Sequence, residues 1–133
     1  MREGVLSSPL STGAKDFLRR HIGSLLKLDI VLLLQNDPAR WWSASHVAEE
    51  LRVGPGIARE ALEELGATNL LDMRIGIDLT YRFEPWQADA AEFVEEIAGA
   101  RYEARELVAQ RAGTTAAKRF ADAFRLRSNK NDG

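Results

Sequence analysis

The sequence contains no cysteine, which excludes disulfide bonds, thiol catalysis and cysteine-ligated metal sites. The fold must therefore rest on burial of apolar side chains, and 133 residues with 45% hydrophobic content are enough for one compact domain with an appendage. Long apolar runs are also missing. The most apolar stretch, from Leu25 to Leu34, contains Lys27 and Asp29 and falls well short of the roughly 20 residues that cross a bilayer.

The N-terminal residues show no basic start followed by an apolar run and a small-residue cleavage site, which is the pattern of a secretory signal. Together with the lack of a membrane-spanning segment, this predicts a cytoplasmic protein without a membrane partner.

Residues for metal binding and catalysis are scarce as well. The two histidines, His21 and His46, fall on different predicted helices, and neither has a second ligand at metal-binding spacing. The sequence Gly54-Pro55-Gly56 lacks the lysine and the spacing of a phosphate-binding loop. No serine can be matched with a histidine and an aspartate as a nucleophile system. We therefore expect no metal, no cofactor and no enzymatic activity.

The charge is unevenly distributed along the chain. Residues 1–100 carry 10 basic and 16 acidic side chains, whereas residues 101–133 carry 8 basic and 4 acidic ones. The overall net charge of −2 argues weakly against strong nucleic-acid binding, because neutralisation of phosphates supplies most nonspecific affinity. The basic side chains are concentrated at the C-terminal end.

The first half of the chain predicts an arm followed by helices. Residues 1–13 are rich in Ser, Gly and Pro and lack periodicity, which is typical of a flexible arm. A helix is expected to begin near Ala14. Residues 24–35 include eight apolar side chains in twelve, so a helix there should be covered on most sides. Asn36-Asp37-Pro38 should end it, because the residue before a proline disfavours helical geometry.

Two shorter helices follow with a tight connection. Ala44 to Leu51 fits one helix, and the next should start at Pro55, which suits the first helical position. The connection, Arg52 to Gly54, has the length and the glycine expected of a helix-turn-helix. The inward face of the second helix is predicted to comprise Ala58, Ala61, Leu62 and Leu65.

After Asn69, alternating apolar residues predict a strand pair. Met73, Ile75, Ile77, Leu79, Tyr81 and Phe83 occupy every second position, as on the buried face of a hairpin. The turn is expected at Gly76 or at Ile77-Asp78. Three helices and such a hairpin describe a winged helix over residues 14–85.

The remaining residues, 86–127, predict a helical extension. A long helix is expected from 86 to about Gln110, then a short basic amphipathic helix over 116–127 and a disordered tail over 128–133. The fold class is thus mainly α with a small β-hairpin: a winged helix-turn-helix followed by a long C-terminal helix and a short terminal helix.

The segments WSASHVAEELRV, GPGIAREALEELGATNLL and TYRF, after a leucine-rich helix, resemble the winged-helix domains of bacterial transcriptional regulators. The whole chain looks like small uncharacterised bacterial proteins of this class. The resemblance covers a little under half of the chain and implies binding to double-stranded DNA, with the helix from Pro55 in the major groove and the hairpin as the wing. The residues that it implies for DNA binding are Arg40, Arg52, Gly56, Arg59, Arg74 and Arg82.

A second interpretation is a protein-interaction module, because the helix from Pro55 carries one arginine against three glutamates. The partner would bind this acidic helix or the basic C-terminal helix, where Phe120 and Phe124 lie four residues apart. The terminal helix could instead cover the domain's own core, which is the preferred interpretation, or lie on a membrane surface, for which its apolar face is small. The long helix could pair two copies into a homodimer through Phe93, Ile97 and Leu107, or fold back on Leu25 to Leu34 and complete the core. The sequence leaves both alternatives open.

Overall fold

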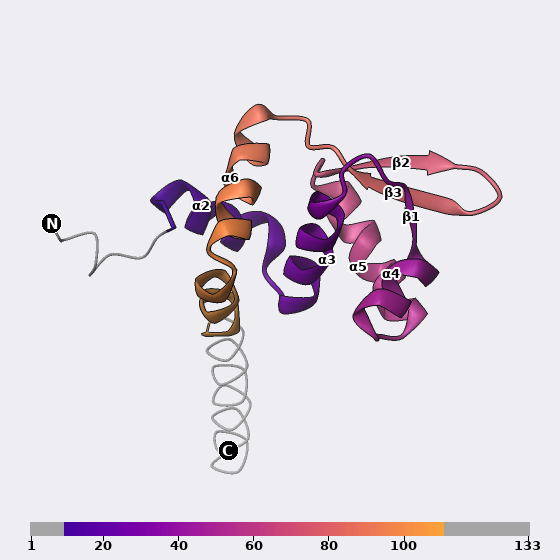
Figure 1. The fold of residues 1–133 in the computed structure, drawn as a ribbon, viewed down its shortest axis with the longest axis horizontal. Helices are drawn as coiled ribbons and strands as arrows, with labels where there is room; N and C mark the ends of the chain where they lie inside the picture. Colours follow the sequence, from indigo (N-terminus) through magenta and orange to yellow (C-terminus); the bar gives the residue numbers. More distant parts are fainter. Residues whose placement is uncertain (1–9, 111–133) are drawn as a thin grey trace, which may run out of the picture.

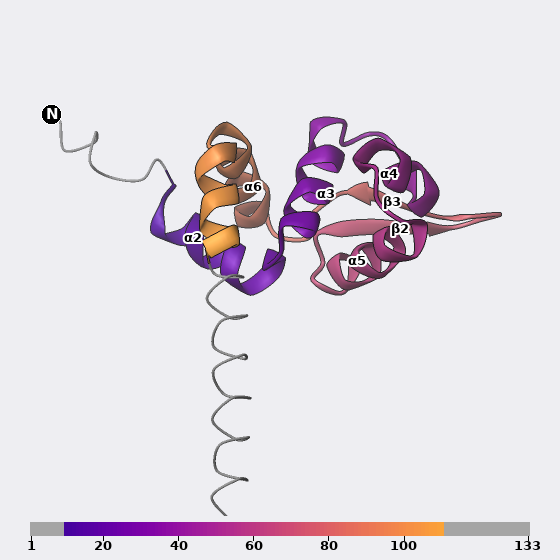
Figure 2. The same cartoon turned by 90° about the horizontal axis from the view of Figure 1, so that it is seen from below.

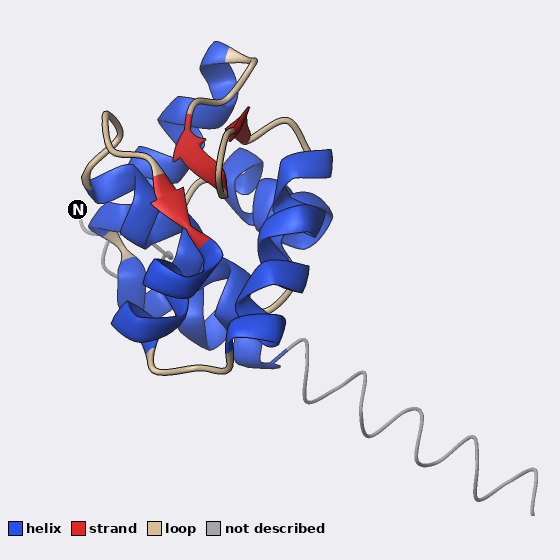
Figure 3. Cartoon of the chain, turned by 90° about the vertical axis from the view of Figure 1, so that its right-hand side faces the viewer, coloured by secondary structure: helices blue, strands red, loops and turns tan. Residues whose placement is uncertain are grey.

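The computed structural model describes residues 10–110, which form a mainly helical winged helix-turn-helix fold with one small antiparallel sheet (Figures 1 and 3). In chain order the elements are α2 (Thr12–Phe17), the π-helical turn η1 (Leu18–Ile22), α3 (Leu25–Asn36), β1 (Trp42–Ser43), α4 (Ala44–Leu51), α5 (Pro55–Ala67), β2 (Leu71–Ile75), β3 (Leu79–Phe83) and α6 (Ala88–Gly99). Residues 101–110 are helical as well. The predicted terminal helix and tail, with Phe120 and Phe124, lie outside the described residues.

The N-terminal helix begins two residues before the predicted start near Ala14. The Ser11 hydroxyl accepts a hydrogen bond from the Ala14 amide and so caps α2 at Thr12. Leu10 is buried, so residues 10–13 belong to the folded unit rather than to the predicted arm. Gly23 adopts a φ of 74° and ends η1, a left-handed conformation that glycine accepts without strain.

Helix α3 lies at the centre of the fold, as its apolar composition predicts. It contacts α5 and β3 of the winged unit on one side and α6 on the other. Five of its residues are buried, namely Leu28, Ile30, Val31, Leu32 and Leu34. Ser24 caps its N-terminus by accepting from the Lys27 amide. The prediction of a helix covered on most sides is confirmed.

Helices α4 and α5 form the predicted helix-turn-helix. Arg52, with φ 59°, is the left-handed residue that ends α4, and the Val53 amide donates to the Ala48 carbonyl at 3.0 Å. Pro55 opens α5 after Gly54. The predicted inward face is confirmed, since all four of its residues are buried: Ala58, Ala61, Leu62 and Leu65.

The sheet has three strands in the order β1-β3-β2, one more than the predicted hairpin. The two residues of β1 pair with β3, Trp42 opposite Tyr81 and Ser43 opposite Thr80. Strands β2 and β3 pair from Leu71 opposite Phe83 to Ile75 opposite Leu79. The turn therefore comprises residues 76–78, as predicted.

The predicted buried face of the hairpin is correct for two of its six residues. Tyr81 and Phe83 are buried, and so is Leu71 opposite Phe83. The outer part of the hairpin extends past the helices (Figures 1 and 2), so the same alternation continues onto side chains with no cover. Four predicted core residues are consequently exposed: Met73, Ile75, Ile77 and Leu79.

The helical extension is divided rather than continuous. Ala100, with φ −127° and ψ 46°, separates α6 from the helical residues 101–110. Helix α6 packs against α2 and α3, and Arg105 forms an ion pair with Asp29 of α3. The extension thus folds back on α3, the second of the two predicted alternatives. In the range 10–110, no helix has the length and apolar character needed to span a bilayer.

Candidate nucleic-acid interface

Helix α5 and the hairpin define one face of the molecule. Figures 1 and 2 show the hairpin projecting beyond the helical body next to α4 and α5. The inward face of α5 is fully used in the core, so its remaining side chains face solvent. Gly56, in its first turn, is exposed, and a Cβ there would meet nothing within 4 Å. The backbone at the start of α5 is therefore accessible to a large partner.

Three of the predicted arginines are exposed around this face. Arg52 ends α4, Arg59 lies on α5, and Arg74 lies on β2. Within the described residues, neither Arg52 nor Arg59 forms an ion pair. Both guanidinium groups are available for an external acceptor.

Arg40 has internal partners. Its guanidinium lies 3.9 Å from the centre of the Trp42 ring and within hydrogen-bonding distance of His46, at 2.9 Å from Nη2 to Nε2. The Trp42 and His46 rings are themselves 5.2 Å apart. Arg40 therefore helps to fix the segment that leads into α4, and its guanidinium is less available to a phosphate than those of Arg52 and Arg59.

Arg74 and Arg82 share an aromatic platform that the sequence did not reveal. Both guanidinium groups lie over the Trp41 ring, at 4.4 and 4.5 Å from its centre. This face of the hairpin is opposite to the apolar one. Of the adjacent Trp41 and Trp42, only Trp42 is buried, while half-buried Trp41 orients the two arginines.

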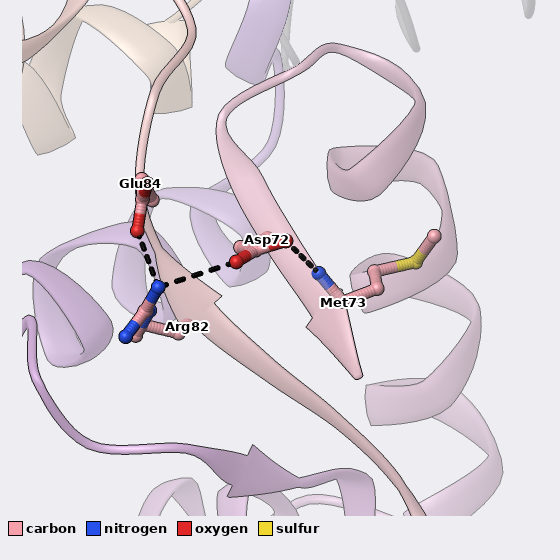
Figure 4. A network of polar contacts seen from close by, with 4 residues as sticks. All are labelled: Asp72, Met73, Arg82 and Glu84. Carbon is pink, nitrogen blue, oxygen red and sulfur yellow. Dashed lines mark hydrogen bonds and ion pairs between the residues drawn. The ribbon is translucent and has the colours of Figure 1, made fainter. Parts of the chain in front are cut away.

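Arg82 is also engaged in ion pairs. Its Nη2 lies 3.3 Å from a carboxylate oxygen of Asp72 and 2.6 Å from one of Glu84 (Figure 4). Figure 4 also shows the Met73 side chain directed away from this network, toward α5. Because two carboxylates already neutralise it, Arg82 offers less positive charge to a phosphate than Arg74 does.

The outer side of α5 is acidic. Glu60, Glu63 and Glu64 are all exposed, and Glu64 forms an ion pair with Lys27 of α3. Glu60 and Glu63 have no ion pair among the described residues. Lys27 of α3 therefore compensates part of the acidic character that the sequence indicates, and two exposed carboxylates on α5 remain without an ion pair among these residues.

Tyr81 connects α5 to the hairpin. Burial raises the pKa of its phenol, the negative charge of Glu63 raises it further, and the positive charge of Arg59 opposes the increase. The Tyr81 hydroxyl is buried and has no hydrogen-bond partner within the described part of the chain. The residues of α5 thus act electrostatically on the base of the hairpin.

The predicted dimerisation residues are largely used within one chain. Ile97 is fully buried, and the Phe93 ring packs against Phe17 with 5.7 Å between ring centres. Phe93 also lies so close to Gly13 that a Cβ there would come within 2.8 Å of the ring. Leu107 is half-buried. These contacts complete the core of one molecule.

No protein-family model matches the chain, and no curated protein matches it. Among solved structures, the chain is similar to ZitR from Lactococcus lactis. One mutant of that protein is 16% identical, with 77% of this chain and 73% of that chain covered and a TM-score of 0.48. A second mutant is 13% identical, with 89% of each chain covered and a TM-score of 0.48. At such values the likeness carries no information on function.

Proposed function

We propose that the protein is a winged-helix transcriptional regulator that binds double-stranded DNA through α5 and the hairpin. The observation that carries the proposal is the helix-turn-helix of α4 and α5, with the outer side of α5 exposed next to a projecting hairpin. An α-helix presented in this way fits the major groove, and a hairpin beside it reaches the adjoining backbone or minor groove.

The start of α5 supports a phosphate contact. No side chain caps this helix, and Gly56 in its first turn is exposed with open space around it. Free backbone amides at a helix N-terminus favour an anion, both as donors and through the helix dipole. Arg52 lies just before this turn, so an amide and a guanidinium can hold the same strand of DNA.

Specificity and general affinity are assigned to different residues. Arg59 is the basic side chain on the exposed side of α5, and only arginine or lysine makes the frequent bidentate contact to guanine. Arg74, held over Trp41 on the hairpin, suits a phosphate contact. The carboxylates of Glu60 and Glu63 weaken the attraction of one molecule for DNA. A dimer that engages two half-sites compensates for this weak individual affinity.

The test compares single substitutions that each remove one positive charge. Arg59→Ala should relax base preference, with about 1–3 kcal/mol lost at the base it contacts. Arg74→Ala should weaken all duplexes alike. Arg101→Ala, exposed on the helical extension, is the matched control and should leave affinity unchanged. Equal behaviour of all three variants would overturn the assignment.

A second candidate is a module that binds a protein instead of DNA. The observation that favours it is the exposed apolar end of the hairpin, where Ile75 is 88% and Ile77 106% exposed. A wing that only follows phosphates has no use for such side chains. If the protein does not bind duplex DNA at low salt, this candidate replaces the first.

A further inference from the structure

The exposed apolar side chains of the hairpin form a continuous stripe, defined as Met73, Ile75, Ile77 and Leu79. Ile75 and Leu79 are directly opposite each other in the strand register, and Met73 is opposite buried Tyr81. The stripe is therefore an extension of the core out into solvent. Strand β2 is also an edge of the sheet, so its outer backbone groups are open to a partner.

The stripe adjoins the acidic side of α5. The Met73 sulfur would lie 3.3 Å from a Cβ placed on Gly66, near the end of that helix. Glu63 acts electrostatically on Tyr81, the cross-strand neighbour of Met73. The unpaired carboxylate of Glu63 thus lies beside the apolar stripe, and Glu60 lies one helical turn before Glu63 on α5. Such a surface is complementary to a partner that is both apolar and basic.

This chain contains a segment of that chemistry outside the described residues. Residues 111–133 carry six basic and two acidic side chains. Within them, AAKRFADAFRLR at 116–127 places Phe120 and Phe124 four residues apart among Lys118, Arg119, Arg125 and Arg127. Neither the core nor the proposed DNA contacts account for this segment.

We infer that residues 116–127 of a second copy of this chain dock on the surface formed by α5 and the apolar stripe. The phenylalanines cover the stripe, and the basic side chains face Glu60 and Glu63. The docking gives each molecule both a donor segment and an acceptor surface, so two copies can exchange segments reciprocally.

The position of the extension favours a second copy over the same chain. Residues 101–110 lie at the end of the molecule away from the hairpin (Figures 1 and 2). Only residues 111–115 connect them to the docking segment, and five extended residues span at most about 18 Å. Docking on a second copy does not require this short connection to return across its own molecule to the hairpin.

The inference does not depend on DNA binding. If the surface also binds DNA, the docked segment and DNA compete for α5, and self-association lowers DNA affinity. The test is therefore made without DNA, so that failure of either proposal can be recognised separately.

The absence of native cysteine permits cross-linking between introduced cysteines. An affinity-tagged Ile77→Cys protein is mixed with an untagged Ala123→Cys protein under mild oxidation. Ala91→Cys, at an exposed position on α6, replaces Ile77→Cys as the matched control. The mixed disulfide dimer should form at least about fivefold faster with Ile77→Cys than with Ala91→Cys, since docking raises the local thiol concentration.

A charge exchange decides whether the contact is specific. Adding Glu60→Lys and Glu63→Lys to the Ile77→Cys protein should slow cross-linking about fivefold, and adding Lys118→Glu and Arg119→Glu to the Ala123→Cys protein should restore it. Equal rates for the Ile77→Cys and Ala91→Cys proteins, or no response to the charge changes, would overturn the inference. Rapid intrachain cross-linking in an Ile77→Cys/Ala123→Cys protein would overturn the assignment to a second copy.

Discussion

At the scale of single residues, the buried hydroxyl of Tyr81 is a testable weakness of the core. It has no hydrogen-bond partner among the described residues, so its burial costs free energy without compensation. Tyr81→Phe should raise the free energy of unfolding by about 1 kcal/mol in urea denaturation at pH 7. A loss of stability would contradict this and indicate that the hydroxyl is hydrogen-bonded in solution.

The pH dependence of the free energy of unfolding provides a second test of the environment of Tyr81. The pKa of Tyr81 is raised in the folded protein, mainly by burial and then by Glu63. The unfolded chain ionises first, near the ordinary value of 10, while the folded protein keeps its phenol proton. The stability that is present below about pH 10 is therefore lost as pH rises through the folded pKa. Between pH 9 and 11 (about the range of the phenol), the wild type should therefore lose more stability than Tyr81→Phe does.

Substitution of Arg52 is expected to affect stability and DNA binding in opposite directions. With φ 59° it occupies a conformation that costs a non-glycine residue about 1 kcal/mol, and its side chain is exposed. Arg52→Gly should raise the melting temperature while weakening DNA binding, because it removes both the strain and a phosphate ligand. A variant that loses stability would show that the arginine side chain supports the turn.

At the scale of elements, the hairpin consists of a buried base and an exposed end. Leu71→Ala at the base should lower the free energy of unfolding by about 2–5 kcal/mol. Ile75→Ala on the same face and strand, where the side chain is 88% exposed within one molecule, should change it by less than about 0.5 kcal/mol at protein concentrations too low for self-association. Chemical denaturation measures both. Equal losses under these conditions would mean that the end of the hairpin is covered within its own molecule.

The elements also differ in how far the sequence predicts them. Helices α3 and α5 follow from local signals, such as Ser24 as a cap, Pro55 at a helix start and apolar spacing. Strand β1 does not, because two residues form a strand only through pairing with β3, far away in the chain. Alternation in the hairpin predicts one apolar face but not its cover, since cover depends on how far the helices extend.

For the candidate site and the helical extension as well, the sequence predicts exposure better than it predicts tertiary contacts. Arg52, Arg59 and Arg74 are exposed as their positions suggest, whereas the two carboxylates beside Arg82 and the position of Trp41 depend on tertiary contacts. The break at Ala100 had one local signal, the preceding Gly99, but the apolar spacing continues across it. The apolar spacing of α6 does not show whether this helix packs on its own core or on a second copy, because that depends on tertiary packing.

At the scale of the whole molecule, α6 joins the N-terminal helices to the winged unit. Ile97 is fully buried among them, so Ile97→Ala should lower the free energy of unfolding by about 2–5 kcal/mol and leave the mass of the particle unchanged. Light scattering and denaturation measure the two effects. A dimer converted to monomers by this substitution would instead place Ile97 at an interface. Tyr102→Ala, at a 74% exposed position, is the control and should alter neither property.

The central claim, that α5 and the hairpin bind DNA, is tested most directly by fluorescence anisotropy with a random 30-base-pair duplex at low and moderate salt. The account predicts binding whose affinity falls with salt, with a logarithmic slope of about −0.9 for each phosphate contacted. Arg74→Ala should make that slope shallower by about one contact. The absence of binding at low salt, or an affinity that is independent of salt, would contradict the claim.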